Sequence, residues 1–266
     1  GCKVASISVG SSITPDNALT IAPVGVGGPV LVRATGADGS CTVTTKRGEK
    51  EVAVRANTIV ITDGSPDAVG VGLQDTFTLE LTPQPSSSFA VNLSVAANGP
   101  CVLAADEVTT TEGSTLSIPV VSGRARYTFT VRGRSLSSCD STCTIAATTS
   151  QQPWPSPVTF DPVPIVFPGL RLHGLPGSLW QNAENEPFEI QIGVPTDDDR
   201  DLRHVQTVRP GVLPVPVEAC VDNAVIADVV GAAGSASNCR SATIQPGDAA
   251  TVTNALQLDP KTAATV

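Results

Sequence analysis

The sequence predicts an all-β protein made of tandem antiparallel β-sandwich modules. Three observations predict this class: apolar and polar residues alternate with a period of two, the alternating segments recur, and 22 Pro and 23 Gly occur among 266 residues. A helical bundle would need long stretches of helix-forming residues, and this chain has only four Lys. We therefore expect short strands separated by turns, and close to no helix.

The alternation is clearest in residues 75–81, 89–95 and 124–132. Successive side chains of a strand point to opposite faces, so one set in each segment is predicted to face a core. These inward sets are Phe77, Leu79 and Leu81; Phe89, Val91, Leu93 and Val95; and Ala125, Tyr127, Phe129 and Val131. The outward set of the third segment includes Thr130 and Arg132.

The alternating segments form an internal repeat. Phe77 corresponds to Phe188, Leu79 to Ile190 and Leu81 to Ile192, each 111 positions later. A second series, made of three short segments, occurs in three copies. The first copy is residues 1–3, 19–24 and 29–34, the second is 100–102, 116–120 and 126–131, and the third is 219–221, 242–247 and 249–255. This register puts Cys2, Cys101 and Cys220 at one equivalent position, and Cys41 at that of Cys143.

The repeat divides the chain into modules. We expect a truncated sandwich over residues 1–50, a full module over 51–150 and another over 170–266, as part of a longer array. Residues 151–169 contain six Pro, which fix φ and remove hydrogen-bond donors, and predict a semi-rigid linker. An edge strand protected by its prolines is the alternative for residues 163–167.

The seven Cys favour disulfides over a metal site, because no CxxC pair or Cys–His spacing occurs. An oxidising, extracellular location follows. The repeat predicts Cys2–Cys41, and Cys101 with Cys143 or its neighbour Cys139, each closing a loop worth about 4 kcal/mol. The last module lacks the matching Cys, so Cys220–Cys239 is predicted there. One of Cys139 and Cys143 is then left over.

The repeated pattern resembles immunoglobulin-like and Calx-β-like sandwich repeats of extracellular proteins. The resemblance is carried by Phe77, Leu79, Leu81, Pro83, Val91, Leu93, Ile118, Gly123, Tyr127, Phe129 and Val131. It implies tandem immunoglobulin-like antiparallel modules. The richness in Ala, Val, Thr, Pro and Gly, with twelve Arg against four Lys, also resembles large surface glycoproteins of green algae, including those of ciliary membranes and mastigonemes.

Composition excludes two classes of partner. The net charge is −9, which would repel a nucleic-acid backbone. No apolar run approaches the roughly 20 residues of a membrane span. The partners we expect are neighbouring modules, copies of the same protein, and glycans.

Two candidate sites remain. Asn92, in the sequence Asn-Leu-Ser on an outward strand position, is the one N-glycosylation sequon without Pro. Asp197, Asp198, Asp199 and Asp201 form an acidic run in the last module. Calx-β domains bind calcium in acidic loops, so the resemblance makes this run a weak calcium candidate, although Arg200 interrupts it. A solvated loop is the alternative.

No catalytic pattern accompanies these residues. His173 and His204 lie apart, without a nucleophile motif, and no cofactor motif is present. The expected function is a non-enzymatic structural or adhesive region of an extracellular surface glycoprotein. Carbohydrate- or protein-binding accessory modules of a secreted protein are the alternative. The aromatic residues Trp154 and Trp180, which flank the predicted linker, are expected to pack it onto the last module, and a role as exposed binding anchors is the alternative.

Overall fold

The chain forms two compact units, Gly1–Ala56 and Asn57–Val266. The structure, a computed structural model, describes residues 27–35, 47–54, 56–63, 68–134, 141–181, 183–231 and 238–261. These residues form strands and turns without a helix, so the predicted all-β class is confirmed. No helix able to cross a membrane occurs in the described ranges. Cys2, Cys41 and Cys139 lie outside them.

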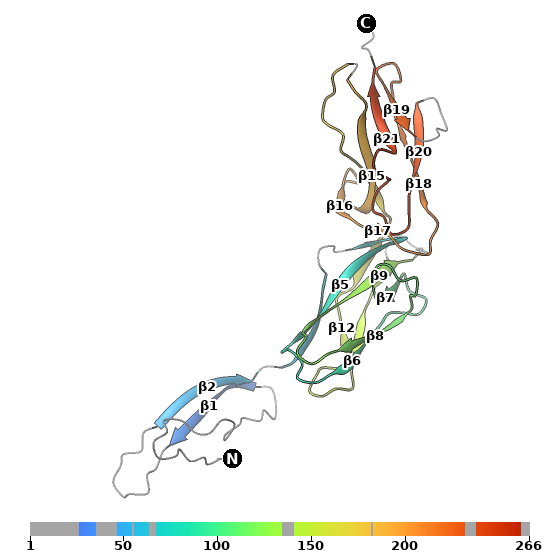
Figure 1. Cartoon of the computed structure of the whole chain (residues 1–266). Coiled ribbons are helices and arrows are strands. Elements are labelled where there is room, and N and C mark those ends of the chain that lie inside the picture. Colours follow the sequence, from blue (N-terminus) through green and yellow to red (C-terminus); the bar gives the residue numbers. More distant parts are fainter. Residues whose placement is uncertain are drawn as a thin grey trace, which may run out of the picture. The chain divides into compact units, whose positions relative to one another are not determined.

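The first unit is described through one antiparallel strand pair (Figure 1). Strand β1 (Gly27–Thr35) pairs with β2 (Arg47–Val54), with Val30 opposite Val52. Strand β2 therefore continues past residue 50, where a module boundary was expected. The break between the two units follows Ala56.

The first part of the second unit, residues 57–166, is a β-sandwich that we call lobe 1. One sheet has the order β3-β5-β9-β7, and the facing sheet has the order β12-β11-β6-β8. A third, short sheet has the order β10-β13-β4. The strands are β3 (Thr58–Asp63), β4 (Val69–Gly70), β5 (Leu73–Thr82), β6 (Phe89–Ser94), β7 (Cys101–Ala104), β8 (Thr115–Val120), β9 (Arg126–Gly133), β10 (Ser141–Cys143), β11 (Ala146–Thr148), β12 (Val158–Thr159) and β13 (Val163–Val166).

The core of lobe 1 lies between these sheets, and it contains side chains that the apolar–polar alternation predicted to face inward. Phe77 and Leu79 of β5 are buried with Val91 and Leu93 of β6. The rings of Phe77 and Phe129 lie 6.0 Å apart, which anchors β5 on β9. Period-two alternation therefore predicted the core-facing side of these strands correctly.

Residues 169–260 form a second sandwich, lobe 2. One sheet has the order β14-β15-β21-β19, with β16 also paired to β15, and β18 pairs with β20 in the other. Its core includes Phe188, Ile190, Ile192, Ile244 and Leu256. The strands are β14 (Gly169–His173), β15 (Glu186–Pro195), β16 (Leu202–Val205), β18 (Val215–Cys220), β19 (Ala227–Gly231), β20 (Cys239–Ile244) and β21 (Leu256–Pro260).

The 111-residue repeat reappears in the strand register. Ile59 of β3 lies opposite Leu81 of β5, and Leu170 of β14 lies opposite Ile192 of β15. Both residues of the second pair come 111 positions after their counterparts in the first. The two lobes therefore open with strand pairs of the same register.

The expected equivalence of Cys101 and Cys220 is wrong. Cys101 lies on β7, which pairs with β9, whereas Cys220 lies on β18, which pairs with β20 as β6 pairs with β8. The short sequence motif around Cys101 and Cys220 is similar, but it lies on strands that belong to non-equivalent sheets of the two lobes. The structure nevertheless contains the predicted disulfide Cys220–Cys239, and it contains Cys101–Cys143, one of the two pairings predicted for Cys101.

The stretch 151–169 is not an isolated linker. Trp154 is 6% exposed and its ring lies 5.8 Å from that of Phe89. Strand β12 pairs with β11, and β13 pairs with both β10 and β4. The apolar side chains between the prolines outweigh the loss of donors, because their burial in lobe 1 is favourable.

The strand order of lobe 1 differs from that of an immunoglobulin domain. If β3, β5, β6, β7, β8, β9 and β11 are lettered A to G, the sheets read A-B-F-D and G-C-E. An immunoglobulin constant domain has A-B-E-D and C-F-G. One shared feature is a tyrosine corner: the Tyr127 hydroxyl accepts a hydrogen bond from the backbone N–H of Val121 at 2.7 Å and lies 3.0 Å from the Arg124 carbonyl.

The disulfide of lobe 1 should stabilise the unit more than that of lobe 2. Cys101 and Cys143 are 42 positions apart, and Cys220 and Cys239 are 19 apart. In the chain-entropy model, replacing both Cys of a pair by Ser should cost about 4 kcal/mol for the first and about 3 kcal/mol for the second. Urea unfolding followed by Trp154 fluorescence and hydrogen exchange measures both. A larger cost for the Cys220–Cys239 pair would contradict the expectation.

Candidate functional site at the junction of the lobes

A cluster of buried polar residues, which includes Gln74, Arg132 and Gln206, lies where lobe 2 joins lobe 1. Strand β17 (Thr207–Val208) pairs with Leu73 and Gln74 at the start of β5, while β3 pairs with residues 77–82 of β5. A strand from lobe 2 thereby continues the ladder of a lobe 1 sheet. Leu73 and Val208 are packed in the core of lobe 2, so β5 contributes to both cores.

Gln206 connects the lobes through its side-chain amide. It is 2% exposed, and its oxygen accepts a hydrogen bond from the N–H of Gly70 at 2.8 Å. Its nitrogen donates to the carbonyl of Ala68 and to Asp75 Oδ2, both at 2.9 Å. The amide thus pairs with the lobe 1 backbone as another strand would, and the polar atoms are satisfied on burial.

Asp75 is the acidic centre of this contact. Its Oδ2 also lies 3.1 Å from His204 Nε2, and its Oδ1 accepts from the backbone N–H of Thr76. His204 is therefore a residue of the junction, a position that its isolation in the sequence did not indicate.

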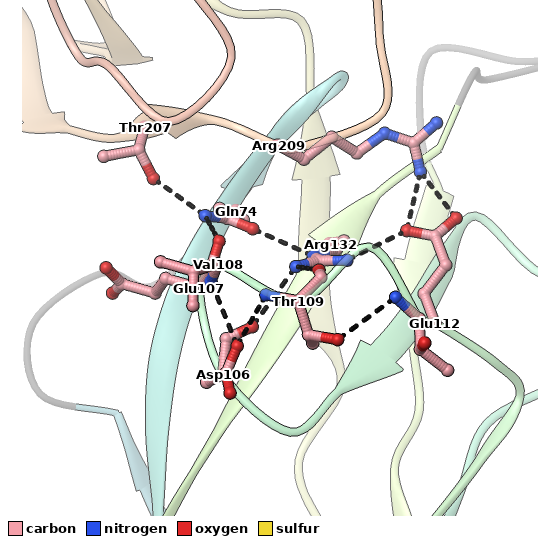
Figure 2. A network of polar contacts seen from close by, with 10 residues as sticks. Gln74, Asp106, Glu107, Val108, Thr109, Glu112, Arg132, Thr207 and Arg209 are labelled. Carbon is pink, nitrogen blue, oxygen red and sulfur yellow. Dashed lines mark hydrogen bonds and ion pairs between the residues drawn. The ribbon is translucent and has the colours of Figure 1, made fainter.

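A second polar network surrounds Arg132 (Figure 2). Arg132 is fully buried, and its Nε donates to Gln74 Oε1 at 2.8 Å. Its other nitrogens donate to the carbonyls of Asp106 and Thr109 and to Glu112. The Gln74 amide in turn donates to Thr207 of lobe 2.

The expected outward exposure of Thr130 and Arg132 is wrong. Both alternate correctly with the core residues of β9, but residues 105–114 cover this outer face, and Arg132 donates to two of their carbonyls. Alternation distinguishes the two faces of a sheet and does not show whether a loop covers one of them.

Glu112 connects this loop to lobe 2. It accepts hydrogen bonds from Arg132 at 3.4 Å and from Arg209 at 3.2 Å. The backbone N–H of Arg209 also donates to the Gly72 carbonyl at 3.0 Å. Glu112 therefore lies between two cations, one from each lobe, which lowers the cost of burying Arg132.

The backbones approach closely at Gly133. A Cβ there would meet the carbonyl oxygen of Gly70 at 2.2 Å, so no larger residue fits without moving the strand. The Gly133 carbonyl accepts from Gly72 N–H, and Val71 forms a bridge with Gly133. Gly133 thus lets β9 touch the segment that leads into β5.

The acidic run of lobe 2 lies in the β15–β16 connection. Asp197 and Asp201 pair with Arg203 and Arg171. The Thr196 hydroxyl donates to Asp198, and together with the backbone N–H of Arg200 it lowers the pKa of that carboxyl. Asp199 has a φ of 55° in the turn.

These carboxylates do not converge on one point. In the described ranges, one group of three potential metal ligands lies close together, Glu218 with Cys220 and Cys239, and its two sulfurs are bonded to each other. The candidate calcium ligands Asp197, Asp198, Asp199 and Asp201 instead serve a hydrogen-bonded turn with arginine partners.

Asn92 lies on the outer face of β6 and is exposed. Its neighbours across the ladder are Ser117 of β8 and Thr148 of β11. Small polar side chains therefore flank the sequon, and no bulky or charged group lies directly opposite Asn92.

Arg132 should contribute far more to the free energy of unfolding than an exposed arginine of the same strand. Arg132→Met leaves the buried oxygens of Gln74 and two loop carbonyls without a donor, and we expect a loss of about 3–5 kcal/mol in unfolding free energy. Arg126→Met, which removes an exposed pair with Glu80, should cost under about 1 kcal/mol. Urea unfolding followed by Trp154 fluorescence compares them. Equal costs would argue against a stabilising role of the network.

The junction residues had only a weak signal in the sequence. Gln74, Gln206 and Arg132 are polar residues within or beside apolar strands, but nothing in their spacing links positions more than 130 residues apart. Comparison with known proteins adds no family: no protein-family model matches the chain, and no curated protein matches it.

Proposed function

We propose that this chain is a non-enzymatic structural or adhesive repeat region of a large extracellular surface glycoprotein, of the cell-surface or ciliary kind. Its role is to space and present surfaces at a fixed geometry. The two disulfides are compatible with an oxidising compartment. Gln74, Gln206 and Arg132 form structural hydrogen bonds at the junction, which suits a scaffold.

The observation that carries this proposal is the β17–β5 ladder with Gln206 beside it. Domains of one chain usually move relative to each other unless their interface is large. Here a shared strand, a buried amide and ion pairs join the lobes, and hydrogen bonds are directional. A spacer needs this kind of joint, because a free hinge would not hold two surfaces at a set distance.

Residual dipolar couplings test the rigid joint. In the wild-type chain one alignment tensor should fit both lobes. Gln206→Ala leaves Gly70 N–H and the Ala68 carbonyl unpaired, so the tensors should separate and stability should fall by about 1–3 kcal/mol. Gln257→Ala, which removes an exposed contact with Asn185, serves as the matched control. Two different tensors in the wild type would contradict the spacer role.

We further propose that Asn92 carries an N-linked glycan, as expected of a surface glycoprotein. The chain secreted from a eukaryotic cell should lose mass on enzymatic deglycosylation. Asn92→Gln and Ser94→Ala should each abolish that loss, because both destroy the sequon, while Ser94→Thr should keep it. An unmodified Asn92 peptide in the secreted wild type would refute this proposal and leave the spacer role standing.

A binding role has one observation in its favour. Trp180, expected to pack a linker, is 87% exposed in the β14–β15 connection of lobe 2, whereas Trp154 is buried. Exposed Trp residues are common anchors for protein and carbohydrate ligands. A Trp180→Ala variant that loses binding in a glycan or surface-protein screen would favour accessory binding modules over a spacer.

A further inference from the structure

A small cavity lies on the outer face of the β5–β9 sheet of lobe 1, beside the start of the loop 105–114. Its volume is about 290 Å³. The strands contribute Thr76 of β5 with Thr128 and Thr130 of β9. Thr76 lies directly opposite Thr130, and Thr128 is two positions away on the same strand, so the three side chains share one face of the sheet. Hydroxyl-bearing side chains therefore form the strand side of this cavity.

Thr130 places a buried hydroxyl at this cavity. The residue is 1% exposed, and its hydroxyl has no hydrogen-bond partner among the described residues. A buried hydroxyl without a partner costs free energy, because it has lost its contacts with water. The Thr76 hydroxyl, by contrast, donates to Glu107, and Thr128 is exposed. Thr130 therefore offers a hydrogen-bonding group that no described residue uses.

The loop supplies two carboxylates to the same cavity. Asp106 and Glu107 both line it and are both exposed. Asp106 Oδ1 accepts from the backbone N–H groups of Val108 and Thr109, and Glu107 Oε1 accepts from the Thr76 hydroxyl. Within the described ranges, no donor contacts the second oxygen of either carboxylate. Each carboxylate is thus held through one oxygen and can accept a further hydrogen bond through the other.

Buried donors fix the main chain of this loop. Arg132 donates to the carbonyls of Asp106 and Thr109, and Gln74 donates to the carbonyl of Glu107 at 2.8 Å (Figure 2). The Glu107 side chain points away from Arg132 in the same view. A site that is held in place before its ligand arrives loses less free energy to ordering when the ligand binds.

The charge and the lining of the cavity define the class of ligand. Of the described residues that line it, two carry a negative charge and none carries a positive charge. The nearby Arg132 is already paired with Glu112. The lining also includes apolar groups, among them Val108, which is 83% exposed. The net charge of −9 attracts cations to the chain as a whole. A ligand that fits has a cationic head with hydrogen-bond donors and an aliphatic stem.

We propose that this cavity binds the side chain of a lysine from a partner protein. The ammonium group has three donors, which can serve Asp106 Oδ2, Glu107 Oε2 and Thr130 Oγ1. The four-carbon stem can then cover Val108. The loop residues 105–108 are exposed, so the main chain of the partner stays in solvent. This inference does not rest on the extracellular role, because the binding chemistry requires no particular compartment.

An NMR titration of the full 266-residue chain with Nα-acetyl-lysine methylamide provides the test. We expect saturable shifts of the amides in residues 105–108 and 128–130. The norleucine analogue has the same stem without the ammonium group and should bind at least about tenfold more weakly, because hydrogen bonds of charged groups are the stronger ones. Equal binding of the two compounds, or shifts confined to other residues, would overturn the proposal. Binding of n-butylammonium without binding of the lysine compound would also overturn it, because the ligand would then be a free amine.

Thr130→Val tests the buried hydroxyl separately from the fold. The substitution keeps the shape of the side chain and removes a group that has no partner to lose, so the melting temperature should not fall. Affinity for the lysine compound should fall about fivefold, the usual effect of one hydrogen bond. Unchanged affinity would contradict the proposal.

Glu107→Gln tests the charge. It keeps an oxygen that can accept from Thr76, and affinity should fall about tenfold because the hydrogen bond to the ammonium is no longer between charged groups. Asp161→Asn is the matched control, since it removes one exposed carboxylate beside β12 of the facing sheet. Affinity should then stay within about twofold, because distant exposed charges are screened by salt. Equal losses in the two variants would show that the cavity itself is not the binding site.

Discussion

The two-lobe unit depends on the pairing of β17 with the first residues of β5. Through this ladder one strand takes part in two cores, since Leu73 packs in lobe 2 and Phe77 packs in lobe 1. A strand is stiff over four residues, so the lobes share a rigid element. Moving one lobe against the other would break the ladder and expose Leu73, and both changes cost free energy.

The polar groups around this ladder define its geometry more than they add stability. A buried ion pair contributes little compared with well-packed apolar side chains, but removing one partner leaves an uncompensated charge. Arg132, Glu112 and Arg209 form such a set, and Gln206 satisfies three groups of lobe 1 at once. We interpret these contacts as selecting one arrangement of the lobes, because any other would leave buried donors or acceptors unpaired.

The sequence predicted the features that depend on short-range pattern. Alternation identified β5, β6 and β9 and their core faces, and the 111-residue shift predicted the common register of β3–β5 and β14–β15. The pairing around Gln206 could not be predicted in this way, because it joins residues whose proximity depends on how two folded lobes meet. The burial of Arg132 was missed for a related reason. Residues 105–114 fold over the outer face of β9, and the position of a loop cannot be predicted from residue periodicity.

The prolines of residues 151–169 suggested a spacer between modules, yet this stretch completes lobe 1. Ile165 lies in the lobe 1 core only four positions before β14 begins in lobe 2. A sandwich of this type is therefore closed by the chain that leads to its neighbour, and its boundary cannot be drawn where the repeat ends. This dependence explains how modules with few large aromatic residues bury sufficient apolar area, because side chains of an adjoining segment complete each core.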